Sequence, residues 1–564
     1  MARRKSKNDG PDLFSSSAEA TTSVAEPPSA APATAKTAPR RRSPAPRKGS
    51  TAEQQAAKQR EISISEFFTK NRHLLGFDNP SKALLTTIKE AVDNSLDACE
   101  DGGILPTIRV EVQQVAETRY RVVVQDNGPG IVRAQIPKIF GKLLYGSKFH
   151  TLKQSRGQQG IGISAAGMYG QLTTGKPVRI VSRTGARAAA HQFEVKINTQ
   201  KNEPIITLDE TVDWDAEHGT RVEIELEATH KRGRRSVDDY LTLTAVANPH
   251  LELSYRDPSG EETRYPRVSD ALPHEAQAIQ PHPYGVELGA LMAMLDASKS
   301  RNLKSFLQDE FSRVGPKVAD EIIDAAMLRP QAKPGSLGRD KAEQLLKGIA
   351  ATKIMAPPTN CLSPIGAEEL EAGLRKVVEA EFFTAVSRKP SVYRGNPFLV
   401  EAAIAWNVEG QAGDDLAVLH RFANRVPLQY QQGACAITKS VVGAGWKNYG
   451  LSQSKGALPA GSLVIAVHIA SAWVPFTSES KEAVAGYPEI LKEIKLALQD
   501  CGRRLGQHIR RGKRMAEARK KSDYIKSYIP HIGEALREIL GLSESREKSI
   551  VETLSETLER SRKL

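Results

Sequence analysis

EAVDNSLDA (residues 90–98), DNGPG (residues 126–130) and GQQGIGIS (residues 157–164) follow one another within one stretch of this chain, between Ile88 and Ser164. A solvated helix face, an ordinary turn and a flexible glycine-rich loop can each have such a sequence, so each motif by itself is weak evidence. In combination and in this order the three motifs are specific. The segments on either side are therefore interpreted in the light of this stretch.

The first motif lies in a segment that predicts a helix. Residues 81–100 contain neither proline nor glycine, and apolar residues recur there at helical spacing. Glu90, Asn94 and Asp97 would then share the face opposite the apolar stripe. A carboxylate one turn from a carboxamide can orient a water molecule and help to hold Mg2+, which prefers oxygen ligands and keeps several waters. A plain solvated face is the competing interpretation of this helix alone.

The second motif follows a β-branched run, residues 121–125, which predicts a buried strand. Asp126 would stand at the end of that strand and enter a turn, because Asn127, Gly128 and Gly130 tolerate positive φ. A carboxylate at a strand end can accept a hydrogen bond from an amino group such as that of adenine. An ordinary Asp-Asn-Gly turn accounts for the same residues.

The third motif supplies backbone N–H groups. Gly157, Gly160 and Gly162 allow the main chain to approach phosphates closely, and residues 163–169 predict a helix whose N-terminus faces the anion. The loop lacks the Gly-Lys-Ser/Thr ending of a Walker loop, so by itself it does not define a nucleotide site.

Together the motifs resemble those of the GHKL ATPases, the family that includes gyrase B subunits, MutL, heat-shock chaperones and sensor histidine kinases. The resemblance implies a Bergerat fold, in which ATP and Mg2+ lie in a bent pocket on a sandwich of helices over a mixed sheet. It implies that Glu90 is the general base for water, that Asn94 binds Mg2+, and that Asp126 binds adenine. The residues implied to cradle the phosphates or to close the adenine side are Gly157, Gln158, Gln159, Gly160, Ile161, Gly162, Ile163, Ser164 and Thr220.

Two polar residues shortly before the glycine-rich loop extend the expected phosphate site. Lys148 can reach a phosphate as a point charge, and Ser147 can donate a hydrogen bond. Residues 142–157 are the natural place for a lid that closes over nucleotide. A surface lysine without such a role is the alternative for Lys148.

The composition limits the class of protein. The 564 residues predict several domains, and the formal net charge is +13. The first sixty residues carry 12 Lys and Arg against 5 Asp and Glu, and their Ala, Pro and Ser content predicts a disordered basic tail over residues 1–58. Such a tail can touch nucleic acid without sequence preference, or it can act only as a solubilising leader.

The cysteines and the hydropathy indicate the location. Cys99, Cys361, Cys435 and Cys501 are far apart and form no C-x-x-C pair, which argues against a zinc site or a disulfide framework. No apolar run is long enough to cross a bilayer, and the N-terminus lacks a signal-peptide core. We therefore expect a cytoplasmic, nucleoid-associated protein with no membrane partner.

Two basic segments are candidate contacts for double-stranded DNA. The loop HKRGRRS (residues 230–236) can present Lys231, Arg232, Arg234 and Arg235 to phosphates, although a solvated charge run explains the loop equally well. The second candidate set combines aromatic faces with a cation and consists of Trp446, Lys447 and Tyr449. The alternative is that these residues only pack together and do not contact DNA.

The remaining segments show regular periodicity. Residues 285–350 predict helices with a break at VGPKV (residues 314–318), which resembles a helix–two-turn–helix module. A long helix is expected from Pro488 to about Tyr528, followed by two more helices over residues 530–564. Further strands are expected at residues 178–182, 192–197, 220–226, 398–405, 417–422 and 463–469.

Residues 60–530 are more specifically similar to the B subunits of topoisomerase VI, which are type IIB topoisomerases. The segment VPFTSESKEAV (residues 474–484) matches a region in which the transducer domain of that family sends a lysine into the ATP pocket to meet the γ-phosphate. This catalytic and nucleotide-binding role falls on Lys481, expected at a helix start, with Lys439 in reserve. Without the resemblance, Lys481 is a surface lysine.

The resemblance predicts a multidomain α+β protein. It implies an ATPase subunit whose ATP-dependent homodimerisation gates one DNA duplex through a break made by the topoisomerase VI A subunit, in an A2B2 heterotetramer. A MutL-like repair ATPase and a DNA-binding scaffold with a non-hydrolytic pocket are the alternatives. The expected parts are a basic tail (1–58), a GHKL ATPase domain with an N-terminal strap (59–280), the helix–two-turn–helix module (281–356), an α/β transducer domain (357–500) and a basic helical stalk that contacts the partner subunit (501–564).

Overall fold

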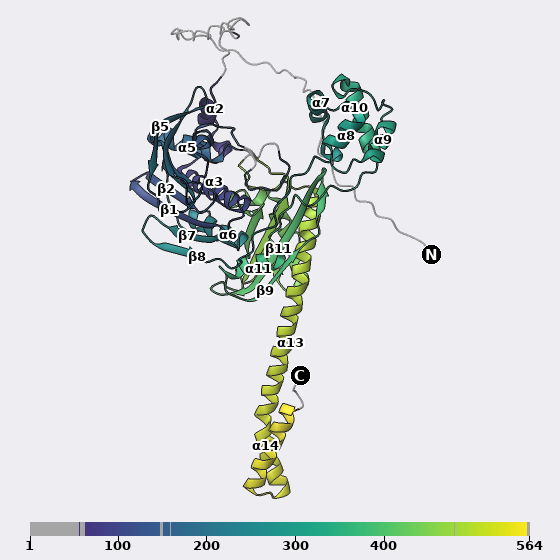
Figure 1. Ribbon diagram of the computed structural model, residues 1–564. Coiled ribbons are helices and arrows are strands. Elements are labelled where there is room, and N and C mark those ends of the chain that lie inside the picture. The colour runs from purple at the N-terminus through teal and green to yellow at the C-terminus, as the bar shows by residue number, and fades with distance from the viewer. Residues whose placement is uncertain (1–55, 57–61, 147–150, 158–159, 479, 561–564) are drawn as a thin grey trace, which may run out of the picture. The chain divides into compact units, whose positions relative to one another are not determined.

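The computed structural model describes residues 56, 62–146, 151–157, 160–478 and 480–560 (Figure 1). The chain divides into two compact units between Glu61 and Ile62, and the architecture described here belongs to the second unit. The predicted tail, apart from residue 56, lies outside the described residues. So do four predicted nucleotide ligands, Ser147, Lys148, Gln158 and Gln159.

A mixed eight-stranded sheet forms the base of the N-terminal part of this unit. Its strand order is β5-β4-β3-β6-β2-β1-β7-β8, and only the β1–β7 pair is parallel. Alternating buried residues explain the strands, as in β4, where every second side chain from Phe193 to Ile197 is buried. The strands are β1 (Thr107–Ala116), β2 (Arg119–Asp126), β3 (Val178–Arg183), β4 (Ala190–Asn198), β5 (Glu203–Val212), β6 (Gly219–Glu227), β7 (Glu252–Arg256) and β8 (Glu262–Tyr265).

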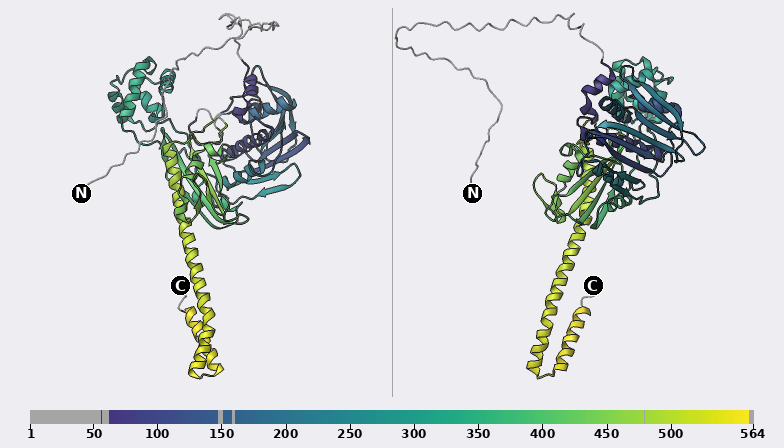
Figure 2. Two further views of the ribbon diagram at one scale, coloured as in Figure 1. Left: turned by 180° about the vertical axis from the view of Figure 1, so that it is seen from behind. Right: turned by 90° about the vertical axis from the view of Figure 1, so that its left-hand side faces the viewer.

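Helices cover one face of this sheet (Figures 1 and 2). The central one is α3 (Pro80–Asp101), which begins where Asn79 caps the amide of Lys82 at 2.9 Å and Pro80 takes the first helical position. Its apolar stripe packs on β2, as the sequence predicts. The helices around it are α2 (Ile64–Lys70), α4 (Ile136–Gly141), α5 (Gly162–Thr174) and α6 (Val237–Ala247). The predicted sandwich of helices over a mixed sheet is confirmed.

A separate helical core follows. Its helices are α7 (Leu288–Ala297), α8 (Leu303–Glu310), α9 (Pro316–Ala325) and α10 (Arg339–Ala351), and their apolar faces enclose one cluster of buried residues. Gly315 is the N-cap of α9 and Pro316 its first residue, so the predicted break at residues 314–318 is confirmed.

A second sheet lies C-terminal to these helices. Its order is β10-β11-β16-β12-β13, with β9 also paired to β11 and with β12 parallel to β16. α13 packs along β9 and β11. The elements are α11 (Ala367–Arg375), β9 (Ala380–Ser387), β10 (Ser391–Tyr393), β11 (Asn396–Val408), β12 (Val418–Ala423), β13 (Val426–Pro427), α12 (Ala436–Val442), β14 (Ser452–Gln453), β15 (Pro459–Ala460) and β16 (Leu463–Ser471).

The long helix α13 runs from Pro488 to Leu540, further than predicted. Only one more helix follows among the described residues, α14 (Glu544–Arg560), so the expectation of two helices after residue 530 was wrong. Pro530 does not end α13, because α14 packs antiparallel to this part and ion pairs such as Lys526–Glu559 (2.9 Å) join the two helices. The predicted boundary between residues 500 and 501 also falls inside this helix.

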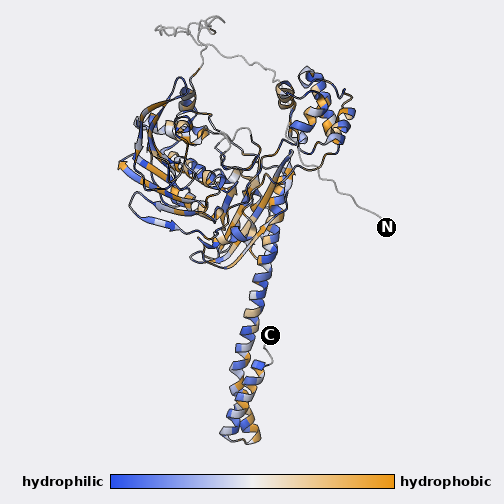
Figure 3. Ribbon diagram, in the orientation of Figure 1, coloured by the Kyte–Doolittle hydropathy of each residue, from blue (hydrophilic) through white to orange (hydrophobic). Residues whose placement is uncertain are grey.

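The two parts of α13 differ in their surroundings. Apart from Ile529 and Gly533, its buried residues lie between Ile490 and Ile509, where the helix packs on the second sheet, whereas the distal part is mostly hydrophilic (Figure 3). Within the part of the chain that the structure describes, no helix has both the length and the apolar character that crossing a lipid bilayer requires.

Candidate functional site

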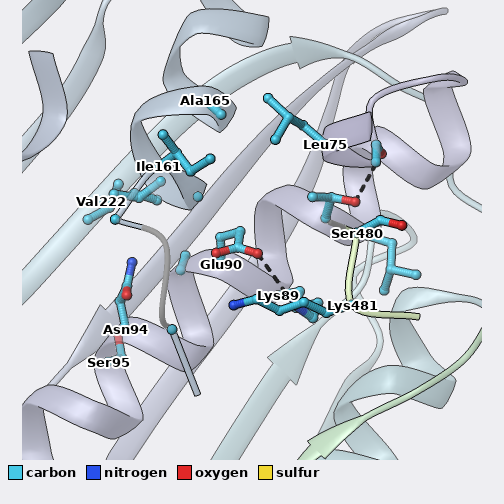
Figure 4. Close-up of a pocket in the computed structure, with 18 of the residues that line it drawn as sticks. Leu75, Lys89, Glu90, Asn94, Ser95, Ile161, Ala165, Val222, Ser480 and Lys481 are labelled. Atoms are coloured by element: carbon cyan, nitrogen blue, oxygen red, sulfur yellow. Dashed lines mark hydrogen bonds and ion pairs between the residues drawn. The ribbon is translucent and has the colours of Figure 1, made fainter. Parts of the chain in front are cut away.

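A cavity of about 320 Å3 lies between α3, the glycine-rich loop and two loops of the second sheet domain (Figure 4). It combines residues from the motifs of the first domain with residues 427–430 and 480–482 of the second. The predicted site residues that line it are Glu90, Asn94, Asp126, Gly157, Gly160, Ile161, Gly162, Ile163, Thr220 and Lys481.

Glu90 projects from α3 against the first residue of α5. A Cβ built on Gly162 would lie 1.7 Å from Glu90 Oε2, so only glycine leaves room for this carboxylate. Lys89 Nζ lies 3.4 Å from Glu90 Oε1 and 3.7 Å from Asp93 Oδ2. Burial by itself would lower the pKa of Lys89, but the two carboxylates outweigh it and raise that pKa. Glu90 thus faces the cavity beside a firmly charged ammonium group.

Asn94 follows Glu90 by one helical turn and is exposed to the cavity. Its Oδ1 would lie 3.9 Å from a Cβ on Gly157, so the amide faces the start of the glycine-rich loop. No group of three His, Cys, Asp or Glu among the described residues could hold a metal ion. Mg2+ typically takes one or two protein oxygens and completes its shell with phosphate and water. The oxygens of Asn94 and Glu90 fit that requirement.

Asp126 ends β2 and is buried at the inner end of the cavity. Its Oδ1 accepts from the amides of Gly128 (2.9 Å) and Thr220 (3.1 Å), and its Oδ2 accepts from Ser95 Oγ (2.8 Å). Burial raises the pKa of Asp126, although these three hydrogen bonds act to lower it. At Gly219 φ is +133° and a Cβ would lie 2.2 Å from the Asp126 carbonyl oxygen, which explains the glycine before Thr220.

Two residues of the sequence motifs lie outside the cavity. Asp97 is buried and its Oδ1 accepts from Arg156 at 2.8 Å, so it does not share the cavity with Glu90 and Asn94. Ser164 is buried in the first turn of α5, where its hydroxyl donates to the carbonyl of Ile161 at 3.2 Å. Asp97 shares the helix face of Glu90 and Asn94, but Arg156 covers it, so it takes no part in the cavity. The role predicted for the main chain at Ser164 stays a prediction.

Lys481 reaches the cavity from the second domain (Figure 4). It lies in a loop between the bridged residues Phe476 and Val484, with φ +53°, and not at a helix start as expected, since α13 begins only at Pro488. Burial lowers the pKa of Lys481, while the Glu90 carboxylate opposes that shift. The reserve candidate, Lys439, is exposed on α12 and is not among the residues that line the cavity.

Sequence reasoning missed several cavity residues. Lys82 on α3 forms an ion pair with Glu482 at 2.6 Å and lies 5.2 Å from the ring centre of Tyr430. Lys89 was also missed, although its position directly before Glu90 is a signal. Glu482 directly follows Lys481, which is a signal of the same kind, whereas Tyr430 has none, because its partner Lys82 is distant in sequence.

The basic loop 231–235 is exposed between β6 and α6. Arg232 is ion-paired with Asp257 and, at 2.8 Å, with Glu261, so its charge is partly neutralised. The Arg235 backbone N–H donates to Asp239 Oδ2 at 2.9 Å, and φ at Arg235 is +62°. That bond engages only the backbone of Arg235, so Lys231, Arg234 and Arg235 are the exposed loop cations that the described ion pairs leave available to a phosphate.

Trp446 does not fit the predicted DNA contact. Its side chain is fully buried among apolar residues, and its Nε1 donates to the carbonyl of Val441 at 2.7 Å. Tyr449 packs closely over Gly502 of α13, where a Cβ would lie 2.6 Å from its ring. The prediction was wrong for Trp446, because the aromatic pair anchors a loop to α13, and only Lys447 of this set is exposed.

Two family profiles match the chain. Residues 79–230 match the family described as "Histidine kinase-, DNA gyrase B-, and HSP90-like ATPase", and residues 357–521 match "Topoisomerase VI B subunit, transducer". The first profile spans the three motifs and strands β1 to β6 of the sheet that carries Asp126, and the second spans the domain that carries Lys481.

Curated relatives match over most of their length. The chain is 50% identical over 490 residues to the B subunit of type 2 DNA topoisomerase 6 from Methanococcoides burtonii, and the match covers 87% of this chain and 79% of the relative. It is 48% identical over 486 residues to the protein of the same name from Archaeoglobus fulgidus, covering 86% of this chain and 80% of the relative.

Proposed function

This chain belongs to the family of topoisomerase VI B subunits and is an ATP-dependent type II topoisomerase subunit with a GHKL ATPase domain and a transducer domain; from that premise we propose that it hydrolyses ATP in the cavity around Glu90. One observation carries the proposal. Residues of the ATPase domain and Lys481 of the transducer line the same cavity of about 320 Å3. A MutL-like repair ATPase and a non-hydrolytic scaffold, the alternatives, are set aside because of these relatives.

The proposed roles follow from the position of each side chain. Glu90 is the general base, because its carboxylate faces the cavity beside the N-terminus of α5 and can orient a water molecule. Asp126 accepts the adenine amino group, since backbone and hydroxyl donors already fix its orientation. The main chain at Gly157, Gly160 and Gly162 receives the phosphates, where glycine permits close approach.

Asn94 is the proposed protein ligand of Mg2+. When bound, Mg2+ would supply positive charge that neutralises the phosphate oxygens. Lys481 contributes a second positive charge from the transducer, at a half-buried position in the cavity. Because this lysine would contact the terminal phosphate, the position of the transducer relative to the ATPase domain depends on whether that phosphate is present.

We further propose that nucleotide drives homodimerisation. The N-terminal strap leaves the apolar side chains of Ile62 and Phe67 exposed at 44% and 49%, and such side chains are available to a second copy. A nucleotide that binds the dimer more tightly than the monomer shifts the equilibrium by that difference in affinity.

The distal part of α13 is the proposed contact for the topoisomerase VI A subunit. The proposed assembly is an A2B2 heterotetramer, in which the A subunit makes the double-strand break through which the second duplex passes. Large apolar side chains are exposed there on an otherwise hydrophilic helix, a pattern typical of interfaces. These side chains include Tyr524, Ile525, Tyr528, Ile532, Ile539 and Leu540.

Double-stranded DNA is the proposed ligand of the basic loop. Lys231, Arg234 and Arg235 are exposed there, and Lys447 adds a cation in the transducer. A subunit that gates a DNA duplex would work on the chromosome in the cytoplasm, and we place this chain there.

The test is ATP turnover by the purified chain, alone and with its A subunit, together with relaxation and decatenation of DNA. The proposal expects turnover by the chain alone, dimerisation with a non-hydrolysable analogue, and DNA relaxation only with both subunits and ATP. A chain that binds the analogue without turnover in either sample would overturn ATP hydrolysis as the function of this cavity.

A further inference from the structure

The segment that leads into the glycine-rich loop is held by the transducer domain. The Gln154 side chain donates to the carbonyl of Ser363 at 2.9 Å and accepts from its amide at 2.7 Å. The Gln154 amide donates to the carbonyl of Cys361 at 2.9 Å. Asn424 Nδ2 donates to the carbonyl of Ser155 at 3.1 Å. These contacts lie two and three residues before Gly157, and none of them involves Lys481.

The next residue ties the same segment to the helix of Glu90. The buried guanidinium of Arg156 donates to Asp97 at 2.8 Å and to both oxygens of Glu100 at 2.7 Å, and it also donates to Asn248 Oδ1 at 2.5 Å. Burial by itself would raise the pKa of Glu100, but the Arg156 guanidinium lowers it well below its usual value. The base of the glycine-rich loop is thus fixed between α3 and the transducer.

The transducer contact comes from a strained turn. Asn424 and Arg425 connect β12 to β13 and have φ of +48° and +66°. Glycine adopts this backbone region most easily, and asparagine is tolerated there, whereas arginine is uncommon. Strain of this kind persists only where surrounding contacts enforce it. The two side chains therefore have a role that glycine, the easier residue, does not fill.

Buried hydrogen bonds hold both residues in place. Asn424 accepts from the Ser471 amide and donates to the Ser471 carbonyl, both at 2.9 Å. The Arg425 amide donates to His468 Nε2 at 3.0 Å, and its guanidinium donates to the carbonyl of Pro364 at 2.9 Å. Burial lowers the pKa of Arg425 to about 10, with the Glu100 carboxylate acting in the opposite direction. A cation is costly to bury, so its hydrogen bonds are needed to keep Arg425 in this turn.

We propose that Asn424 is a positioning residue for ATP turnover, which joins the transducer to the base of the glycine-rich loop as a second connection, separate from Lys481. This inference rests on the proposed function of the cavity. Through the Ser155 carbonyl, Asn424 fixes the point at which Gly157 enters the cavity, and Gln154 completes the connection. A movement of the transducer therefore reaches the phosphate-binding main chain even where Lys481 makes no contact.

The first variant is Asn424→Gly, because glycine keeps the positive φ and removes the bond to Ser155, together with the two bonds to Ser471 inside the transducer. The loss of the bond to Ser155 predicts an increase of about three- to tenfold in KM for ATP, with a smaller change in kcat. Asn407→Gly is the matched control, since Asn407 has φ +56° but is exposed and bonds Glu381 instead. The control is expected to retain the parent KM.

The second variant removes a contact of the same connection by changing a residue of the ATPase domain, Gln154. Gln154→Met removes the bonds to Ser363 and leaves the Asn424 turn intact, so it decides the question even if Asn424→Gly lowers the melting temperature. Arg425→Gly tests the turn itself, with Arg394→Gly as its control, because Arg394 also has positive φ (+43°) and is exposed.

Hydrogen exchange separates positioning from general destabilisation. In Asn424→Gly and Gln154→Met, amides of residues 151–164 are expected to exchange faster, while those of β11 and of residues 463–470 in β16 keep the parent rates. The Ser471 amide is left out of this comparison, because it donates to the Asn424 side chain. When either variant is combined with Lys481→Ala, the fold-changes in KM of the two single variants should multiply, since the two connections are separate. An active parent whose KM and loop exchange are unchanged in both variants would overturn this inference alone. A parent without nucleotide binding or turnover would overturn the proposed function and this inference with it.

Discussion

Glu90 and Gly162 occupy one space: the carboxylate of the first fills the position where any side chain of the second would begin, with only 1.7 Å between Glu90 Oε2 and a Cβ at residue 162. The helix that carries Glu90 and the glycine-rich loop therefore pack in direct contact at this point. This relationship makes the geometry of the cavity sensitive to a single methyl group.

Gly162→Ala is expected to displace the Glu90 carboxylate and reduce ATP turnover by about 100-fold or more, the lower range of what a general base contributes. Steady-state turnover measures the loss. Gly185→Ala is the control, because a Cβ at that residue meets no atom within 4 Å. Turnover at the parent rate in Gly162→Ala would show that Glu90 has no required position.

Glu90→Gln is expected to bind ATP with nearly the parent affinity and to lose turnover by about 10²- to 10⁴-fold, because the amide retains the shape but cannot accept a proton. Equilibrium binding of a fluorescent analogue and turnover are measured on the same sample. Glu117→Gln, an exposed change in the β1–β2 turn, should leave both unchanged. Turnover retained by Glu90→Gln would exclude Glu90 as the base.

Lys481→Met is expected to reduce the preference for a γ-phosphate analogue over ADP by about tenfold or more, since a hydrogen bond between charged groups is lost. Sedimentation of the analogue-bound protein should show less dimer. Lys439→Met removes a lysine from the exposed face of α12 and should behave as the parent. The reverse result would assign the role to Lys439.

Trp446→Ala is expected to lower the free energy of unfolding by about 3–5 kcal/mol, the usual cost of emptying a buried aromatic site. Denaturant unfolding measures this loss. Trp473→Ala is the matched control, because 57% of the Trp473 side chain is exposed, and a change within about 0.5 kcal/mol is expected. A Trp446→Ala protein of parent stability with weakened DNA binding would restore the predicted DNA contact.

The double variant Lys231→Ala/Arg234→Ala is expected to weaken DNA binding and to reduce the salt slope of log K by about 2, one for each lost phosphate contact. Arg232→Ala should have a smaller effect, since Asp257 and Glu261 already pair with that guanidinium. Arg187→Ala/Lys201→Ala removes two exposed charges elsewhere and serves as the control. Equal losses in both double variants would mean that the total charge, and not this loop, binds DNA.

Local patterns in the sequence were sufficient for most elements. The helix around Glu90, the strand that ends at Asp126 and the helix after Gly162 form as predicted, because periodicity, caps and glycines act over a few residues. The same patterns place Asp97 on the face of Glu90 and Asn94, but they do not show that its carboxylate is covered. Its partner, Arg156, lies far along the chain, and spacing within one helix contains no information about it.

By itself, the sequence determined the family and the three motifs, and it supplied the candidate nucleotide-binding residues, because these depend on residue type and order. Only the tertiary structure decided that Lys481 lies in a loop beside Glu90, that Trp446 is buried, and that Asn424 bonds the carbonyl of Ser155. Contacts between residues hundreds of positions apart arise when whole domains pack together. Burial and backbone hydrogen bonds then fix side chains that no local pattern specifies.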